Sequence, residues 1–345
     1  MDPISSLDRS LRAIYHQTPD RVPVIPQAQS WVMHHYGSSA AELLHDGARL
    51  AELMIQGRRD FGWDGVFVGT DSVALAECAG LQVETTALGP VPHPAGMLSD
   101  LGQASDLHIP AIEKTRLQEW ITATRILSRE IGGEALIIAR GDQGPFTLAG
   151  QLRGMEQFLI DITAGENEAR IHCLLDFCAR YWLAFAARLL EAGAHVVTIG
   201  DALASGSLIS PAAFEKYALP YQRRLAGSIR QMGGLFGVHV CGNTTRVVPR
   251  LAECGAHLLE IDAPTDFTLA VRAARGKTCL LGSVDTSEVM ARGRPQDVEA
   301  ECRWRMKLVM PGSGFILSTG CAISPDVPEE NLRAMVESVE KYGRY

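Results

Sequence analysis

The feature that most constrains this chain is a repeated alternation of short apolar runs with longer amphipathic stretches. The apolar runs are rich in Val, Ile and Leu and lack a regular alternation of polar and apolar residues, which is typical of strands buried on both faces. We predict eight such strands: Val22–Gln27, Gly65–Asp71, Ala135–Gly141, His195–Asp201, Leu235–Gly242, His257–Ala263, Cys279–Asp285 and Gly314–Cys321.

Helical patterns lie between the predicted strands. Several begin after a capping residue or with Pro in the first turn, and several end at Gly. The expected helices are Ala40–Arg59, Thr115–Glu130, Glu168–Ala192, Pro211–Gln231, Thr244–Cys254, Asp266–Arg275, Pro295–Val309 and Pro328–Lys341. Repeated strand–helix units imply a parallel sheet, and eight units predict an α/β fold of the (β/α)8 TIM-barrel type in a single domain spanning residues 1–345.

One stretch interrupts this rhythm. The segment Leu81–Pro110 contains Gly89-Pro90, Pro92, Pro94 and Pro110, which are turn-forming or strand-breaking residues. We predict that it is an insertion after the second strand, folded as a hairpin or as a loop over the barrel mouth.

Composition narrows the classes of function. The net charge is -8, and the Lys and Arg residues are scattered rather than clustered, so a nucleic-acid partner is not expected. The sequence has no recognisable signal peptide and no apolar run long enough to cross a bilayer, so we expect a cytoplasmic protein without a membrane partner. Eight cysteines lie far apart along the 345 residues, which argues against a disulfide framework.

Polar residues follow the predicted strands at the end where barrel enzymes carry their active sites. The strand ends carry Gln27, Asp71, Asp142, Asp201, His239 with Cys241, Asp262, Asp285 and Cys321. Any single Asp here could be a loop cap, because Asp is common in turns. The joint pattern nevertheless predicts an active site at this face.

The sharpest local pattern is His239-Val240-Cys241. Residues two apart on a strand point the same way, so His239 and Cys241 are expected to face the barrel mouth together. The last strand ends with Gly320-Cys321 and can bring a second thiol to them. One nitrogen and two sulfurs suit Zn2+, and three protein ligands leave a catalytic position open. The alternative is a buried histidine with two inert cysteines.

Such a donor set also favours one type of chemistry. Two thiolates and an imidazole nearly neutralise Zn2+, which leaves a modest Lewis acid suited to keeping a substrate thiol deprotonated. Hydrolytic zinc sites more often use His and carboxylate ligands. The predicted site therefore points to sulfur or alkyl-transfer chemistry.

Along nearly its whole length the chain resembles the uroporphyrinogen decarboxylase superfamily, whose fold is a (β/α)8 barrel. The resemblance rests on Gly144-Pro145-Phe146-Thr147-Leu148-Ala149, on Asp201 to Gly206 with Ser210-Pro211, Phe214 and Pro220-Tyr221, on His239-Val240-Cys241-Gly242-Asn243, and on Gly320-Cys321-Ala322-Ile323 with Pro325, Pro328, Glu330 and Asn331.

Within this superfamily the chain looks more like the zinc methyltransferases of corrinoid-dependent systems than like the decarboxylases. These zinc methyltransferases carry a His-x-Cys…Cys zinc signature, which His239, Cys241 and Cys321 reproduce. Cobalamin-independent methionine synthase has a similar arrangement of residues. The resemblance implies that Asp262 is a displaceable fourth zinc ligand and that Asp71 and Asp201 orient substrate or the residues around the zinc. For Asp201, a capping role is the alternative. It also implies transfer of a methyl group between a corrinoid and a small-molecule donor or acceptor. The corrinoid is expected on a separate carrier protein, because the chain lacks an Asp-x-His-x-x-Gly motif.

Two alternative functions remain beside the zinc methyltransferase. The decarboxylases carry an arginine-rich N-terminal run where this chain has Gln27-Ala28-Gln29-Ser30-Trp31, and Gly-His-Gly where it has Gly320-Cys321-Ala322. Asp71, however, resembles their essential aspartate, so a cofactor-free decarboxylase acting on tetrapyrroles is the main alternative. A non-enzymatic zinc or corrinoid binder is the third.

Overall fold

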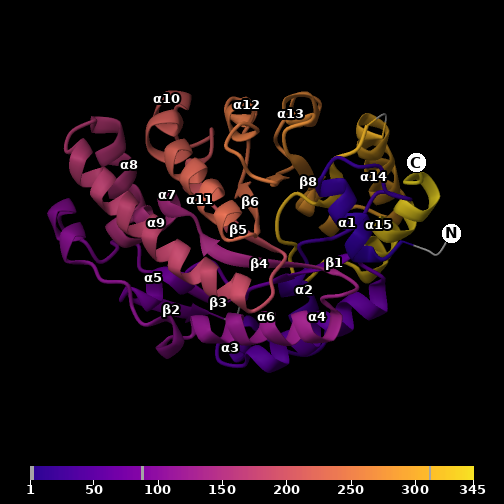
Figure 1. The fold of residues 1–345 in the computed structure, drawn as a ribbon, viewed down its shortest axis with the longest axis horizontal. Coiled ribbons are helices and arrows are strands. Elements are labelled where there is room, and N and C mark those ends of the chain that lie inside the picture. The colour runs from indigo at the N-terminus through magenta and orange to yellow at the C-terminus, as the bar shows by residue number, and fades with distance from the viewer. Residues whose placement is uncertain (1–3, 87–88, 311) are drawn as a thin grey trace.

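Seven parallel strands form the curled sheet at the centre of this computed structural model, which describes residues 4–86, 89–310 and 312–345 (Figure 1). Hydrogen-bonded neighbours follow the order β1-β4-β5-β6-β7-β8-β9. The strands are β1 (Gly65–Val68), β4 (Leu136–Gln143), β5 (Val196–Gly200), β6 (Leu235–Val240), β7 (Leu258–Ile261), β8 (Cys279–Val284) and β9 (Phe315–Thr319). Seven of the eight predicted strands are therefore confirmed, and helices cover the outside of the sheet.

The predicted strand Val22–Gln27 is not part of this hydrogen-bonded ladder, and here the sequence prediction needs correction. The segment makes one parallel bridge, between Val24 and Leu317 of β9. On its other side, the backbone carbonyl of Val24 accepts a hydrogen bond from the N–H of Asp64. Pro23 and Pro26 have no N–H to donate, which explains why the segment lies against β9 without forming a regular strand.

The helices follow the predicted pattern, with shorter pieces where Pro and turn residues intervene. Ala40–Arg59 is divided into α3 and α4, and Thr244–Cys254 contains only the short α12. The α-helices are α1 (Ser6–Ile14), α2 (Gln29–His35), α3 (Ala40–Leu43), α4 (Gly47–Phe61), α5 (Ala74–Cys78), α6 (Leu117–Ile131), α7 (Pro145–Arg153), α8 (Met155–Ala164), α9 (Glu168–Glu191), α10 (Pro211–Ala213), α11 (Leu219–Gln231), α12 (Val248–Leu251), α13 (Phe267–Ala274), α14 (Pro295–Val309) and α15 (Glu329–Tyr342).

Short helices of other types connect these elements. The 3-10 helices are η1 (Leu101–Asp106), η2 (Ile112–Lys114) and η3 (Ala202–Ala204), and the π-helices are η4 (Phe214–Ala218) and η5 (Thr286–Ala291). Because η4 lies between α10 and α11, the predicted helix Pro211–Gln231 changes its hydrogen-bonding pattern partway along. None of the helices in the described part of the chain combines the length and the apolar character that a membrane span needs.

The predicted insertion between residues 81 and 110 contains a hairpin. Its strands, β2 (Val83–Thr86) and β3 (Gly89–Pro92), pair antiparallel in a separate two-stranded sheet. Thr86, Gly89, Pro90 and Val91 line the cavity at the carboxyl end of the parallel sheet. The insertion therefore builds one wall of the candidate site.

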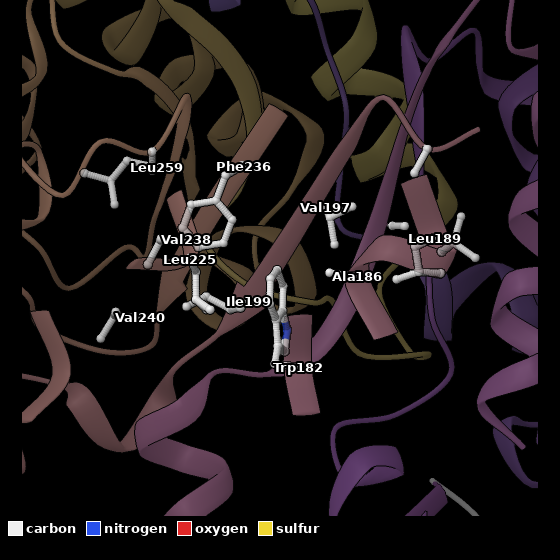
Figure 2. Close-up of a cluster of buried hydrophobic side chains, with 14 of the residues drawn as sticks. Trp182, Ala186, Leu189, Val197, Ile199, Leu225, Phe236, Val238, Val240 and Leu259 are labelled. Atoms are coloured by element: carbon white, nitrogen blue, oxygen red, sulfur yellow. The ribbon is translucent and has the colours of Figure 1, made fainter. Parts of the chain in front are cut away.

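The two faces of the sheet have different neighbours, and this sets the direction of every functional side chain. On the outer face, side chains of β5 and β6 pack against α9 and α11 (Figure 2), including Val197, Ile199, Phe236 and Val238 against Trp182 and Leu225. On the inner face, a second cluster contains Leu136, Ile138, Leu235 and Leu258 together with Ala13 and Ile14 of α1. Because successive strand residues alternate between faces, the inner series of β6 continues from Leu235 to His239.

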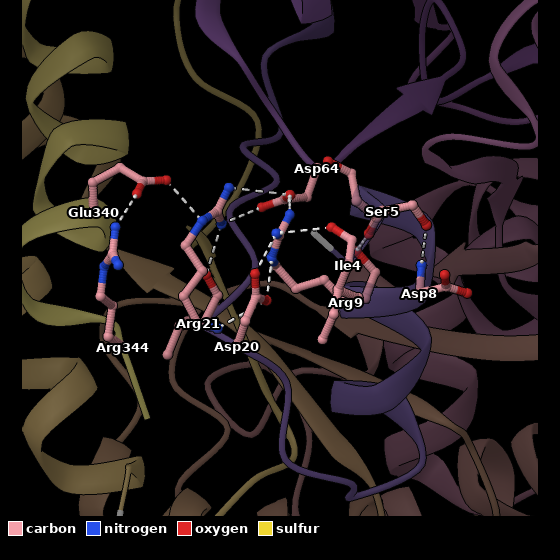
Figure 3. A network of polar contacts seen from close by, with 12 residues as sticks. Ile4, Ser5, Asp8, Arg9, Asp20, Arg21, Asp64, Glu340 and Arg344 are labelled. Atoms are coloured by element: carbon pink, nitrogen blue, oxygen red, sulfur yellow. Dashed lines mark hydrogen bonds and ion pairs between the residues drawn. The ribbon is translucent and has the colours of Figure 1, made fainter. Parts of the chain in front are cut away.

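At the amino end of the sheet, a buried ion-pair network joins distant parts of the chain (Figure 3). Asp64, which precedes β1, accepts hydrogen bonds from Arg9 Nη1 at 2.8 Å and from Arg21 Nη1 at 2.7 Å. The backbone N–H of Val24 donates to the same carboxylate at 2.8 Å. Arg21 also pairs with Glu340 of α15, so this end ties the N-terminal helix to the C-terminal one.

Candidate metal centre

Three potential metal ligands meet at the carboxyl end of the sheet. His239 Nε2, Cys241 Sγ and Cys321 Sγ all lie within 4.8 Å of one another. The imidazole Nε2 is 3.0 Å from the sulfur of Cys241 and 3.6 Å from that of Cys321. His239 belongs to the inner series of β6, whereas Cys321 follows the end of β9. The structure thus brings together the three residues that the sequence pattern selected.

The sizes and chemistry of this set match a tetrahedral zinc site. Bonds of about 2.0–2.3 Å place neighbouring ligand atoms of a tetrahedral zinc ion roughly 3.3–3.8 Å apart. The two nitrogen–sulfur distances of 3.0 and 3.6 Å need only small adjustments to reach this range. His239 is buried, with 4% of its surface exposed, and Cys241 and Cys321 are partly buried. These residues can therefore hold a metal ion on the cavity wall with a fourth position open.

The two thiols have opposite protonation tendencies. A hydrogen bond between them lowers the pKa of Cys321, against the effect of burial, and raises the pKa of Cys241, which burial raises further. Burial lowers the pKa of His239, but the charge of the Cys321 thiolate, its hydrogen bond to the imidazole and the charge of Glu260 together raise it above the ordinary value. Without a cation the set therefore favours one thiolate stabilised by its neighbours, which is the species that binds metal.

A buried carboxylate, Glu260, lies behind the imidazole. Glu260 and His239 are partners in the register between β7 and β6, and Glu260 Oε2 is 3.7 Å from His239 Nδ1. Arg140 of β4 donates hydrogen bonds to both carboxylate oxygens of Glu260, at 3.1 and 2.8 Å. It also donates one to Gln27 Oε1 at 2.8 Å. The 3.7 Å separation is longer than a hydrogen bond, and His239 Nδ1 has no hydrogen-bond partner among the described residues, so Glu260 lies where the carboxylate that orients a ligand imidazole would lie, without making that contact.

Asp262, the predicted fourth ligand, lies beside the three-residue set but not within it. Its Oδ2 accepts the backbone N–H of Gly242 at 2.6 Å, and its Oδ1 accepts that of Ala263 at 2.7 Å. Burial raises the pKa of Asp262, and the Cys321 thiolate adds to the effect. A side chain on Gly320 would come within 2.9 Å of this carboxylate, so glycine is needed for β9 to deliver Cys321 here.

The three candidate metal ligands form part of the wall of a cavity of about 480 Å³. The α2 start, the hairpin and the ends of β1, β4, β5, β6 and β9 contribute the rest of the wall. The lining residues are Gln27, Gln29, Ser30, Gly69, Thr70, Asp71, Ser72, Thr86, Gly89, Pro90, Val91, Arg140, Asp142, Gln143, Gly200, Ala202, His239, Cys241, Cys321 and Ala322. This volume suits a small molecule, within the usual range of ligand pockets.

Asp71 lines this cavity but is held by a cation behind it. Arg116 donates to Asp71 Oδ2 at 2.8 Å and to Oδ1 at 3.0 Å, a two-pronged ion pair. Thr70 Oγ1 donates to the same carboxylate at 2.8 Å. Burial opposes the charge of Arg116, but its hydrogen bond to Asp71 and the nearby carboxylates raise the pKa of the guanidinium. Asp71 is thus firmly held in the wall by three hydrogen bonds.

Asp201 is fully buried and is not among the lining residues. Its Oδ1 accepts the backbone N–H of Thr147 in the first turn of α7 at 2.9 Å, and its Oδ2 accepts Gln222 Nε2 of α11 at 3.0 Å. Asp201 follows Val197 and Ile199 in the outward series of β5, so its side chain faces the helices. Burial raises its pKa to about 6 despite these hydrogen bonds.

The sequence analysis missed Arg140 and Glu260. Both lie on inner positions of their strands, because Arg140 follows Leu136 and Ile138 and Glu260 follows Leu258. The signal was present: a charged residue two positions before a strand-end aspartate, in an otherwise apolar strand. Counting strand residues in steps of two from the apolar inner layer selects both, and it also separates Asp201 from the residues that face the cavity.

Comparison with known proteins confirms the family resemblance. The uroporphyrinogen decarboxylase (URO-D) profile matches residues 5–342, so the chain belongs to the uroporphyrinogen decarboxylase family. It is 30% identical, over 342 residues covering 97% of both chains, to a methylcobamide:CoM methyltransferase MtbA of Methanosarcina mazei. It is 26% identical, over 366 residues covering 98% of this chain and 99% of its relative, to a uroporphyrinogen decarboxylase of Xanthomonas axonopodis.

A solved structure described as a methyltransferase from Methanosarcina mazei shares the fold. It superposes with a TM-score of 0.88 at 22% identity and covers 98% of this chain and 99% of its own. The curled parallel sheet with its outer helices is therefore the architecture of this relative as well.

Proposed function

We propose that this chain is a zinc-dependent methyltransferase. It moves a methyl group between a corrinoid on a separate carrier protein and a small thiol, methyl ether or thioether. The observation that carries the proposal is the meeting of His239 Nε2, Cys241 Sγ and Cys321 Sγ within 4.8 Å on the wall of a substrate-sized cavity. Similarity to a methylcobamide:CoM methyltransferase over 97% of the chain supports methyl transfer as the reaction.

The proposed zinc site has three protein ligands and one possible fourth ligand. When bound, zinc supplies the Lewis acidity that keeps a coordinated thiol deprotonated or polarises an ether oxygen or thioether sulfur. His239, Cys241 and Cys321 would hold the ion, and all three line the cavity in which a substrate would bind. Asp262 becomes the fourth ligand only by giving up the N–H groups of Gly242 or Ala263, which fits a residue that yields to substrate.

The remaining polar residues act as positioning groups. Glu260, itself fixed by Arg140, faces the Nδ1 side of the His239 ring. Asp71, held by Arg116 together with Glu77, shapes the cavity wall. Asp201 holds the start of α7 against α11 and so positions the loop after β5, without touching substrate.

We also propose that the fold works as a single domain in which the segment before β1 completes an eight-stranded barrel. The bridge between Val24 and Leu317, together with the Asp64-to-Val24 hydrogen bond on the opposite side, supports closure at this point. Closure places all the site residues around one mouth.

The test is to purify the chain without added metal, measure its zinc content and mix it with methylcobalamin and a small thiol. The proposal expects about one zinc per chain and a thiol-dependent loss of the methylcobalamin absorption spectrum that a chelator abolishes. Decarboxylation of a porphyrinogen by the metal-free protein would support the alternative function. Zinc or corrinoid binding without any methyl transfer would leave only a binding protein.

A further inference from the structure

One carboxylate on the cavity wall has an unused oxygen. Asp142 is completely buried, and its Oδ2 accepts the backbone N–H of Leu75 at 2.6 Å. Its Oδ1 has no hydrogen-bond partner among the described residues, although the residue lines the cavity. Buried oxygens of Gln143 and Gln29, which line the same cavity, are likewise without a partner in the described part of the chain. The wall therefore offers several acceptors that a ligand can satisfy.

The backbone presents Asp142 to the cavity by an irregularity in β4. The pairing of β4 with β5 shifts register between Arg140 and Gln143, and Asp142 has a φ of +65°. Such bulges re-aim side chains and are common beside active sites. Gly141 is needed for this backbone path, since a side chain at this position would come within 2.8 Å of the Trp182 indole. A residue held in the left-handed region and aimed at a cavity is a candidate for ligand contact.

The charges around the cavity leave Asp142 without a counter-ion. Arg140 is paired with Glu260, and Arg116 is shared between Asp71 and Glu77. Apart from the His239, Cys241 and Cys321 cluster, no other described residue in the cavity lining has a charged side chain. An anionic ligand would meet a carboxylate without a free cation, whereas a cationic one would complete the pairing.

We propose that the small-molecule substrate carries a protonated amine, which donates a hydrogen bond to Asp142 Oδ1 and finds further acceptors in Gln143 and Gln29. The methyl acceptor or donor is then an aminothiol or its S-methyl derivative, rather than a sulfonate such as coenzyme M. This inference rests on the proposed function for the sulfur end of the molecule. The amine only anchors the substrate and takes no part in the transfer.

Three thiols of equal length test the charge preference: 2-aminoethanethiol, 2-mercaptoethanol and 2-mercaptoethanesulfonate. Calorimetry on the zinc-loaded protein should show the amine binding at least about tenfold tighter than the sulfonate, as one charge-assisted hydrogen bond predicts. In Asp142→Asn this preference should shrink to about threefold or less. Asn retains an acceptor for Leu75 and tolerates a positive φ, so the variant should fold. Asp176→Asn, on the exposed side of α9, is the matched control.

The outcomes separate this inference from the proposed function. Tighter binding of the sulfonate, or equal binding of all three thiols by the wild-type protein, overturns the inference even if thiols are methylated. Propylamine and 1-propanesulfonate, which lack sulfur, give a second readout without methyl transfer. Asp142-dependent binding of propylamine alone supports the amine site even if no thiol is methylated, and loss of that preference overturns it.

Discussion

Asp64 at the amino end of the sheet and Asp142 at the carboxyl end are both completely buried, yet their surroundings differ. Both oxygens of Asp64 accept hydrogen bonds from arginines, and Val24 adds a third donor. Asp142 has one backbone donor, and its other oxygen has no partner in the described part of the protein. The same residue type therefore ties the chain together at one end and offers an open acceptor at the other.

The pKa shifts of aspartates at the two ends of the sheet also differ in direction. At the amino end, the hydrogen bond from Arg9 lowers the pKa of Asp20 more than burial raises it. At the carboxyl end, burial and Asp71 together raise the pKa of Asp142 to about 7. Charges that are paired with an opposite charge stabilise the fold. A buried carboxylate whose pKa is raised and that has no paired cation is available for binding and chemistry. The predictions below test this division, beginning with the largest expected effect.

Replacing a metal ligand should abolish function and leave the fold intact. Cys321→Ser removes a sulfur from the three-ligand set, so zinc affinity and methyl transfer should fall by more than the roughly 10–100-fold cost of losing an outer hydrogen-bonding partner. Zinc content and the rate of methylcobalamin demethylation are the measurements. Cys173→Ser, at an exposed position on α9, is the control and should match wild type. Full activity in Cys321→Ser would remove this residue from the site.

The opposite result is expected at the amino end. Asp64→Asn leaves Arg9 and Arg21 without their buried counter-charge, so the free energy of unfolding should fall by about 3–5 kcal/mol. Urea unfolding measures this loss. The molecules that remain folded should keep their zinc content and turnover, since Asp64 lies at the other end of the sheet. Loss of zinc without loss of stability would contradict the division between the two ends.

A smaller effect is expected behind the imidazole. Glu260→Gln removes the charge facing His239 Nδ1 and leaves Arg140 without its ion pair, so zinc affinity should fall by about 10–100-fold. Competition with a chelator of known affinity gives the value. An unchanged zinc affinity would show that Glu260 serves only to neutralise Arg140.

The pH dependence of stability should differ in sign between the ends. The folded-state pKa of Asp142, about 7, lies above its ordinary 3.8, so the folded protein binds a proton that the unfolded chain has released, and stability falls as pH rises through this window. Asp142→Asn removes the loss, so its stability relative to wild type should improve by roughly 1–3 kcal/mol between about pH 5 and about pH 8.

Asp20 provides the matched opposite case. Its pKa is lowered in the folded protein, so its contribution to stability is present above the ordinary pKa and is lost as pH falls through the folded value. Asp20→Asn should therefore lose stability relative to wild type at neutral pH and approach it in acid. Parallel unfolding curves for the two variants across pH would contradict both assignments.

The sequence predicted the parts of this molecule that depend on local pattern. Seven strands, the long helix α9 and the inserted hairpin follow from apolar runs, caps and Pro or Gly positions. The meeting of His239 and Cys241 was predictable because they are two residues apart at the end of β6. Val22–Gln27 was wrongly predicted to be a regular strand. The prediction followed its apolar side chains and did not take into account that Pro23 and Pro26 have no backbone N–H to donate.

The roles of Asp201, Asp262 and Asp142 depend on contacts that local pattern does not encode. Asp201 is engaged by Thr147 and Gln222, and Asp262 by the backbone of Gly242 and Ala263. Except for Ala263, which follows Asp262 directly, these partners come from other segments of the chain, so only the folded structure shows which aspartate oxygens are occupied. The left-handed backbone of Asp142, at the register shift between β4 and β5, is a further feature that the local sequence pattern did not predict.

The most direct test of the central claim is zinc X-ray absorption spectroscopy on the chain purified without added metal. The account predicts about one zinc per chain, with two sulfur ligands near about 2.3 Å and at least one nitrogen ligand near about 2.0–2.1 Å. The sulfur signal should halve in Cys241→Ser. A protein that transfers methyl groups without zinc, or a zinc ion without sulfur ligands, would contradict the account.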